Sequence, residues 1–374
     1  MHYYVTLTTK CNLQCRYCYG EAYEDFDTDF GNIEIDYSLP TSISYDVADL
    51  RKFCEKDKET VLVFYGGEPL LKIDKLMEIM DNVKAKHYML QTNGLLLDRL
   101  EPKYANRMHT ILVSIDGDER LTDFYRGKGV YRKIVENVKL LRKNGFKGEI
   151  IARMTVMEET DIEKQVQWLL FNKECAFSSV HWQINALFWQ NDFKRRHFAQ
   201  WTSQKYNPQV RKLVKTWVRH METHGKVLKI YPFIGVMESL LKNESSLLRC
   251  GAGWTMFNIQ TDGNITPCPV MAGMKNYYLG NICETHPMKL KNSVFVGHPC
   301  TECKIYAICG GRCLYANVTK RWGMEGFRLV CKTVENLVNC LREAKPKVER
   351  LMREGKIRLE DFEYTKYNSS EIIP

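Results

Sequence analysis

Apolar and polar positions alternate in blocks over the first 190 residues of the chain. Short, nearly continuous apolar runs predict β-strands at residues 3–8, 60–66, 87–93, 110–116, 149–156 and 179–187. Between them, apolar residues recur at helical spacing in 46–57, 72–86, 131–145 and 160–173. Strands apolar on both faces and separated by helices are typical of parallel β/α units. We therefore predict an α/β fold of six units, either an incomplete barrel or an open sheet.

The remainder of the chain divides by composition. Residues 188–248 are helical in pattern, with a long amphipathic stretch at 207–225, and a cysteine-rich part begins at 250. The chain returns to a helical pattern from 332 and ends in a polar tail. We expect four segments: a β/α core at 1–190, a helical bridging segment at 191–249, a cysteine-rich domain at 250–335, and a C-terminal helix and tail at 336–374.

Polar motifs follow the first four predicted strands. A loop with three cysteines comes after the first strand, "GGEP" after the second, "QTNG" at the end of the third and "SIDGD" at the end of the fourth. Because the carboxyl ends of parallel strands meet at one rim, we expect these motifs to converge on a single site. An acidic insertion at 21–36 is placed to cover the cysteine loop.

The cysteines are unevenly distributed. Of 14 cysteines, three lie at 11–18 and nine between 250 and 340, which leaves Cys54 and Cys175 in the long middle. The first ten residues lack a signal-peptide pattern and no apolar run approaches a membrane span, so we expect a cytoplasmic protein outside the membrane. A reducing cytosol disfavours a disulfide framework. The clusters of cysteines therefore indicate two metal regions.

The formal charge of +9 raises the possibility of a nucleic-acid partner. However, the basic residues are scattered along helical patterns such as 139–148 and 345–358, which favours solvated helix faces. We therefore expect no nucleic-acid partner.

The first loop holds Cys11, Cys15 and Cys18 with no fourth cysteine or histidine beside them. Thiolates select zinc or iron–sulfur clusters, and structural zinc requires four protein ligands. Three cysteines instead suit a cluster with one iron open to a non-protein ligand. The stretch "CNLQCRYC" resembles the cluster motif of the radical S-adenosylmethionine (SAM) enzymes.

This resemblance implies a partial (β/α)6 TIM-like barrel in which SAM binds the fourth iron of a [4Fe–4S] cluster. The reduced cluster cleaves SAM to methionine and a 5′-deoxyadenosyl radical, which abstracts hydrogen from the substrate. By position in the motifs, the resemblance implies SAM contacts at Tyr17, Gly66, Gly67, Glu68, Asn93, Ser114, Arg126 and Leu187. Glu68 is expected to meet the SAM ammonium, and Arg126 to lie near the methionine carboxylate.

The second cysteine set resembles the SPASM extension of radical SAM enzymes, which holds two auxiliary [4Fe–4S] clusters. "CTECKIYAICGGRC" alone could be a zinc site. The pattern of all seven cysteines, at positions 250, 268, 300, 303, 309, 313 and 331, is far more specific for this extension. The resemblance implies an outer cluster on Cys300, Cys303, Cys309 and Cys331, and an inner cluster on Cys250, Cys268 and Cys313. Cys283 could complete the inner set, although a buried, unligated thiol is the favoured interpretation, and Cys340 is expected to be structural.

SPASM-type enzymes mostly modify peptides. We predict a peptide maturase that forms a thioether or carbon–carbon crosslink in a ribosomally made peptide. The formylglycine-forming, sulfatase-maturating branch is disfavoured because it has an aspartate where this chain has Pro269. A small-molecule radical SAM dehydrogenase and, from another class, a zinc-binding scaffold for RNA or protein are the alternatives.

The expected partners follow from this class. With ten residues before Cys11, we expect no leader-binding domain there, so that either a separate protein presents the peptide or the enzyme recognises it directly. A flavodoxin- or ferredoxin-type protein is the expected electron donor. No residue is assigned as substrate acid or base. Tyr65, Arg153, His181 and Gln183 could face the cavity, and for His181 a core position is favoured.

Overall fold

A computed structural model describes residues 1–18, 32–175, 177–188, 192–367 and 373–374, so the predicted acidic insertion lies largely outside the described residues. Parallel strands form at the six predicted places: β1 (His2–Thr8), β2 (Val61–Gly66), β3 (His87–Thr92), β4 (Met108–Ser114), β5 (Glu149–Val156) and β6 (Ser179–Ile184). β6 ends earlier than predicted. The chain leaves the sheet after Ile184, and Leu187 adopts a left-handed backbone with φ 71°.

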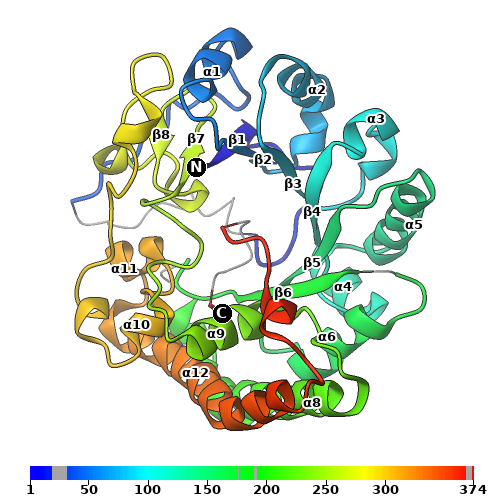
Figure 1. The fold of residues 1–374 in the computed structure, drawn as a ribbon. Helices are drawn as coiled ribbons and strands as arrows, with labels where there is room; N and C mark the ends of the chain where they lie inside the picture. Colours follow the sequence, from blue (N-terminus) through cyan, green and yellow to red (C-terminus); the bar gives the residue numbers. More distant parts are fainter. Residues whose placement is uncertain (19–31, 176, 189–191, 368–372) are drawn as a thin grey trace.

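The helices between the strands cover the outer face of the curved sheet (Figure 1). Four match the helical patterns: α1 (Val47–Cys54), α2 (Ile73–Asn82), α5 (Val130–Lys143) and α6 (Ile162–Phe171). Two short helices, α3 (Pro102–Ala105) and α4 (Glu119–Arg126), were not predicted. In α4, the Asp118 carboxylate accepts from the N–H of Leu121, which provides the N-cap that begins a helix. The predicted partial barrel is confirmed.

The sheet continues beyond the six predicted strands. β7 (Met256–Ile259) pairs in parallel with β1, and β8 (Ile265–Thr266) pairs antiparallel with β7. The strand order is β6-β5-β4-β3-β2-β1-β7-β8. The cysteine-rich part of the chain therefore begins inside the main sheet, and Cys268 comes two residues after the end of β8.

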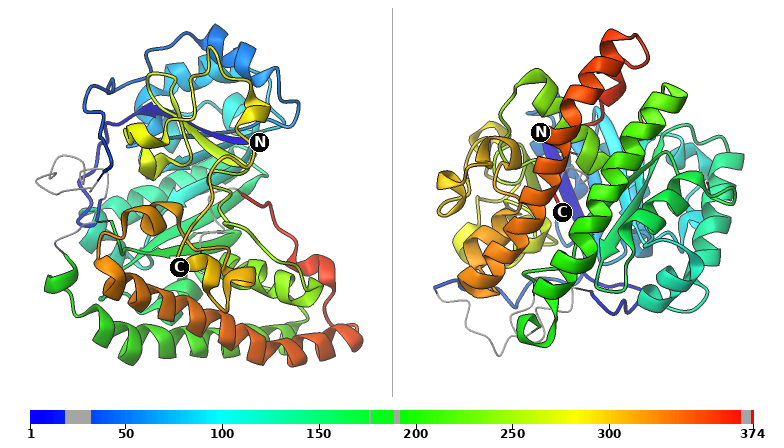
Figure 2. Two further views of the ribbon diagram at one scale, coloured as in Figure 1. Left: turned by 90° about the vertical axis from the view of Figure 1, so that its left-hand side faces the viewer. Right: turned by 90° about the horizontal axis from the view of Figure 1, so that it is seen from below.

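The remaining helices are α7 (Phe198–Trp201), α8 (Asn207–His224), α9 (Tyr231–Lys242), α10 (Tyr306–Cys309), α11 (Leu314–Thr319) and α12 (Gly323–Arg353), with a π-helical turn at Thr202–Tyr206. α12 packs against α8 and α9, and α8 and α12 run side by side in Figure 2. α12 also crosses residue 335, the predicted end of the cysteine-rich domain, and carries both Cys331 and Cys340. Within the described residues, none of the helices is long and apolar enough to traverse a lipid bilayer.

Candidate active site

A cavity of about 420 Å³ lies at the carboxyl ends of the strands. All three cysteines of the first loop, Cys11, Cys15 and Cys18, line it. Of the predicted SAM contacts, those that line it are Tyr17, Gly66, Gly67, Asn93, Ser114 and Arg126. The motifs that the sequence placed at one rim are therefore brought together around one space.

The two glycines at the end of β2 fix the start of the cysteine loop. The N–H of Gly67 donates to the Thr8 carbonyl at 2.9 Å, and the N–H of Glu68 donates to the Lys10 carbonyl at 2.9 Å. A Cβ at Gly67 would lie 2.4 Å from the Lys10 carbonyl oxygen, well inside van der Waals contact. Only glycine permits this approach, so the motif holds the backbone that leads directly into Cys11.

Glu68, the predicted partner of the SAM ammonium, has three hydrogen-bond donors from the chain itself. Its carboxylate is fully buried and accepts from the N–H of Leu70 (3.0 Å), the hydroxyl of Thr92 (2.8 Å) and the N–H of Asn93 (2.7 Å). It is absent from the described lining of the cavity. Burial raises its pKa to about 6. The side chain joins the end of β2 to the end of β3, and its contact with the SAM ammonium stays a prediction.

Asn93 connects β3 to the cysteine loop. Its Nδ2 donates to Asn12 Oδ1 at 2.7 Å and lies 3.8 Å from the Cys11 sulfur. Its own Oδ1 accepts from the N–H of Leu95 at 3.0 Å. The side chain is thus held in place beside the first thiol of the loop.

Asp116 organises the opposite side of the loop, and sequence reasoning missed it. Arg126 donates to its two oxygens through Nε at 2.8 Å and Nη2 at 3.1 Å. The Tyr17 hydroxyl and the N–H of Thr155 also donate to it, at 2.6 and 2.9 Å. Burial alone would lower the pKa of Arg126, but the Asp116 carboxylate raises it above its ordinary value. A signal was present, since Asp116 is the aspartate of "SID" at the end of the fourth strand.

The far wall of the cavity is polar. Tyr65, Arg153 and Gln183 line it, as the sequence suggested. Arg153 donates to Gln183 Oε1 at 3.0 Å and to Nδ1 of His181 at 2.6 Å. His181 is fully buried and does not line the cavity, so it occupies the favoured core position.

The cysteine-rich region closes the same cavity. Pro269 and Ala272, which follow Cys268, are among the lining residues, together with Phe188. The neighbouring Leu187, which was predicted as a SAM contact, lines a second cavity in the structure, and its contact with SAM stays a prediction. Its backbone is left-handed, with φ 71°.

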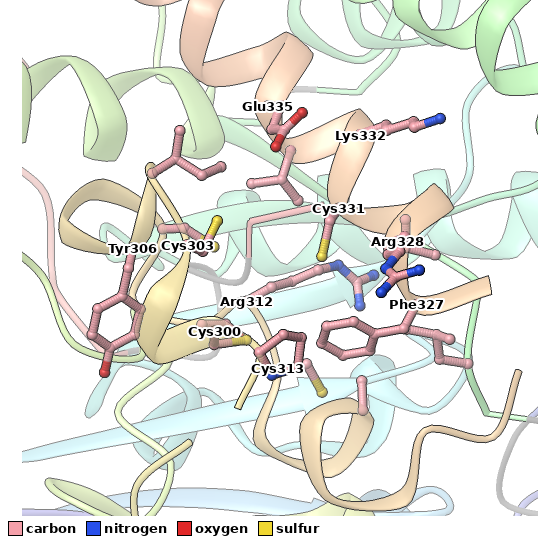
Figure 3. A pocket seen from close by; sticks show the side chains of 18 residues that line it. Cys300, Cys303, Tyr306, Arg312, Cys313, Phe327, Arg328, Cys331, Lys332 and Glu335 are labelled. Carbon is pink, nitrogen blue, oxygen red and sulfur yellow. The ribbon is translucent and has the colours of Figure 1, made fainter. Parts of the chain in front are cut away.

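That second cavity, of about 300 Å³, lies among the later cysteines (Figure 3). Its lining includes the whole predicted outer set, Cys300, Cys303, Cys309 and Cys331, and also Cys313. Burial, with the Cys309 and Cys300 thiols nearby, raises the pKa of Cys331 to about 12. Thiols that lie together around an open space fit a cluster that accepts thiolate ligands.

The predicted inner set is also together. Cys268 is buried, and burial together with the neighbouring Cys313 and Cys250 thiols raises its pKa well above the ordinary value. Cys283 is not part of this group. It is exposed and lies beside Asp49 of α1, so the expectation of a buried thiol is wrong. In the described part of the chain, no three His, Cys, Asp or Glu side chains form a site for a single metal ion.

Comparison with known proteins agrees with this geometry. Residues 5–168 match the model of the radical SAM superfamily. The chain carries a radical SAM domain. This domain covers β1 through most of α6 and therefore includes the cysteine loop and the GGE motif.

Relatives extend the likeness beyond the radical SAM domain. The radical SAM cyclopropyl synthase TigE of Paramaledivibacter caminithermalis is 20% identical, with 92% of this chain and 75% of that protein covered. The antilisterial bacteriocin subtilosin biosynthesis protein AlbA of Bacillus subtilis is 25% identical, over 79% of this chain and 60% of that protein.

Two solved structures share the fold. The structure of anSMEcpe with bound AdoMet and Cp18Cys peptide superposes with a TM-score of 0.67 at 20% identity, and covers 94% of this chain and 98% of that one. Streptococcus suis SuiB bound to its precursor peptide SuiA gives a TM-score of 0.53 at 16% identity, over 84% of this chain and 72% of that one. At these identities the likeness establishes the fold.

Proposed function

We propose that this protein is a radical SAM peptide maturase that forms a thioether or carbon–carbon crosslink within a ribosomally made peptide. The observation that carries the proposal is the composition of the first cavity. The three-cysteine loop and, from the cysteine-rich region, Pro269 and Ala272 line the same space. A substrate between them would contact both parts of the chain. Relatives named for peptide or bacteriocin maturation and fold neighbours with bound peptides support this substrate class.

The radical SAM domain implies one [4Fe–4S] cluster and SAM, and the residues fit both. Cys11, Cys15 and Cys18 would hold the cluster, whose electron and bound SAM supply a 5′-deoxyadenosyl radical. The Gly66–Gly67 backbone holds the loop that carries these thiols. Tyr17 packs against Tyr125 with ring centroids 5.2 Å apart and forms one wall of the SAM space.

Arg126 and Ser114 would bind the polar end of SAM. Arg126 is oriented by its two contacts with Asp116, so its guanidinium stays at the cavity wall while its charge is balanced. The bidentate contact with Asp116 fixes the plane of the Arg126 guanidinium. A cation held in this way is oriented to bind a second carboxylate, that of SAM. Asp116 is therefore a positioning residue that acts through Arg126 and Tyr17.

The two later cysteine sets fit two auxiliary [4Fe–4S] clusters in a domain over 250–335. Cys300, Cys303, Cys309 and Cys331 would hold the outer cluster, and Cys250, Cys268 and Cys313 the inner one. Because Cys283 is exposed beside Asp49, it offers no fourth thiolate to the inner set. The inner cluster is then left with one iron for a substrate thiolate or another ligand, which favours thioether chemistry.

The alternative functions have less support than the peptide maturase. Formylglycine formation by an aspartate after Cys268 has no counterpart, because Pro269 lines the cavity at that position and carries no ionisable group. A zinc-binding scaffold requires ligands that close around one ion. If the protein binds zinc but no iron after anaerobic reconstitution, this would support the scaffold and contradict the enzyme hypothesis. A small-molecule dehydrogenase requires a substrate that fits the same cavity.

Mass spectrometry of a coexpressed peptide tests the proposal. A short cysteine- or aromatic-containing peptide encoded beside the gene is the appropriate substrate. Crosslinking predicts a loss of two hydrogens from the peptide when it is coexpressed with the wild-type chain, and no change with Cys15→Ala. Cys283→Ala is the matched control, because its exposed thiol lies away from both cysteine sets. An unchanged mass with the wild-type chain contradicts the assignment of that peptide.

A further inference from the structure

Arg312 lies in the second cavity with two donor groups unused. Its side chain lines the cavity and the residue is only 7% exposed. Within the described residues, its Nε and Nη2 atoms are buried without a hydrogen-bond partner. Its backbone is left-handed, with φ 51°, an uncommon conformation for a residue with a side chain. A buried cation with unused N–H groups is costly unless a ligand meets it.

The four cysteines of the outer set line the same cavity as Arg312. In Figure 3 its side chain extends between Cys331 on one side and Cys300 and Cys313 on the other. Glu335 is the one carboxylate in the described lining of this cavity, and it is exposed on α12.

A second buried arginine nearby provides the contrast. Arg249 donates through Nε to the Ile308 carbonyl at 2.7 Å, through Nη1 to the Gly235 carbonyl at 2.9 Å and through Nη2 to the Ser239 hydroxyl at 2.8 Å. These bonds join α9 to the cysteine segment and explain its burial. Among the residues that the structure describes, no acceptor meets Nε or Nη2 of Arg312, so packing alone does not explain why a cation is placed there.

We propose that Arg312 donates its unused N–H groups to the sulfurs of the outer cluster, on Cys300, Cys303, Cys309 and Cys331, and raises the reduction potential of that cluster. This inference rests on the proposed auxiliary clusters. One-electron reduction adds one negative charge to a cluster that four thiolates already make anionic. Hydrogen bonds to the sulfurs and a nearby positive charge stabilise the reduced form. Both effects are stronger in a buried site than in water.

A redox titration of the full chain tests this role. Cys11→Ala, Cys15→Ala and Cys18→Ala together remove the SAM cluster, so that only auxiliary clusters contribute to the electron paramagnetic resonance signal. Each auxiliary cluster gives one redox transition, which we call its wave. The wave that disappears when Cys303→Ala and Cys331→Ala are added belongs to the outer cluster. In this background we compare Arg312→Gln, Arg312→Lys and Arg328→Gln. Arg328 lines the same cavity but is exposed, so its variant is the matched control for charge alone.

Arg312→Gln is expected to shift the outer wave to a more negative potential. The shift should be at least twice that of Arg328→Gln, with Arg312→Lys in between, while the inner wave moves less. An outer wave that stays in place, or that moves no further than in Arg328→Gln, overturns the role of Arg312. If the Arg312→Gln variant loses the iron of the outer cluster, the potential shift of Arg312→Lys is compared with that of Arg328→Gln instead. A shift no larger than that of Arg328→Gln again overturns the role of Arg312. Absence of the outer wave and its iron from the parent chain would instead contradict the auxiliary clusters themselves.

Discussion

Arg126 and Asp116 form a buried ion pair beside the three-cysteine loop, with Nε and Nη2 of the arginine 2.8 and 3.1 Å from the two carboxylate oxygens. The Arg126 side chain is 6% exposed and the Asp116 side chain is fully buried. Tyr17, one residue before the third cysteine, donates to the same carboxylate. The pair therefore connects the end of β4, helix α4 and the cysteine loop at one point.

Replacing Asp116 by asparagine is predicted to destabilise the protein by about 3–5 kcal/mol, because it leaves Arg126 buried without its counter-charge. SAM affinity should fall as well, since Arg126 and Tyr17 lose their orientation. Chemical unfolding and calorimetric SAM binding on the reconstituted protein measure the two effects.

The matched control is Asp98→Asn, which breaks the 2.8 Å ion pair with Lys133 at the surface. Exposed pairs contribute about 0–1 kcal/mol, so this variant should unfold and bind SAM almost like the parent. Equal destabilisation by the two variants would argue against a special role for the buried pair.

Gly67→Ala is predicted to disrupt the SAM cluster. The added Cβ would meet the Lys10 and Thr9 carbonyl oxygens at 2.4 and 2.5 Å, so the backbone before Cys11 has to move. We expect the loss of about 4 irons from the roughly 12 that three [4Fe–4S] clusters contain. Gly129→Ala is the control: it has a positive φ of 81° but nothing within 4 Å of the new Cβ. Iron retained in Gly67→Ala would contradict this account of the motif.

The buried carboxyl group of Glu68 predicts a dependence of stability on pH. Its pKa is about 6 in the folded protein, above its ordinary value of 4.5, because burial disfavours the charged form. The folded state therefore binds more protons than the unfolded state between these values. Stability from this group is fully present below about pH 4.5 and is lost as the pH rises through 6, by about 2 kcal/mol in total.

The difference in free energy of unfolding between the wild-type chain and Glu68→Gln isolates this effect. Glutamine has nearly the same shape and no charge, so its contribution stays constant. Between pH 4.5 and 7 the wild-type chain should lose stability relative to the variant. A difference that is independent of pH, or that grows in favour of the wild type, would show that the three donors around the carboxylate outweigh its burial.

Cysteine substitutions should remove iron in three separate groups. Cys15→Ala, Cys268→Ala and Cys309→Ala each affect a different set of neighbouring thiols, so each is expected to lose about 4 irons per chain. Cys283→Ala should lose none, because its thiol is exposed beside Asp49. Iron and acid-labile sulfide analysis after anaerobic reconstitution measures this. Losses that do not separate by group would contradict the assignment of the ligand sets.

Local patterns predicted the core of the fold because its determinants are local. Strands that are apolar on both faces produce continuous runs such as 60–66, and the spacing of Cys11, Cys15 and Cys18 is contained in one loop. The parallel pairing of β7 with β1 was not predictable in this way, since it joins Met256 to His2 across most of the chain.

The direction of individual side chains was also beyond the sequence. Glu68 and Leu187 occupy motif positions, yet three donors of the chain itself meet the Glu68 carboxylate, and Leu187 lines the other cavity. Asp116 was overlooked because its local sequence places it at a strand end but does not show its role. Its importance comes from partners 10, 39 and 99 residues away, which only the folded chain brings together.

Cleavage of SAM tests the central claim most directly. The anaerobically reconstituted chain is incubated with SAM and dithionite, and 5′-deoxyadenosine and methionine are measured by liquid chromatography. Both products are expected to form in the wild-type chain and in Cys283→Ala, and neither in Cys15→Ala. A wild-type chain that carries its full iron and yields no 5′-deoxyadenosine, or a Cys15→Ala chain that yields as much as the wild type, would contradict it.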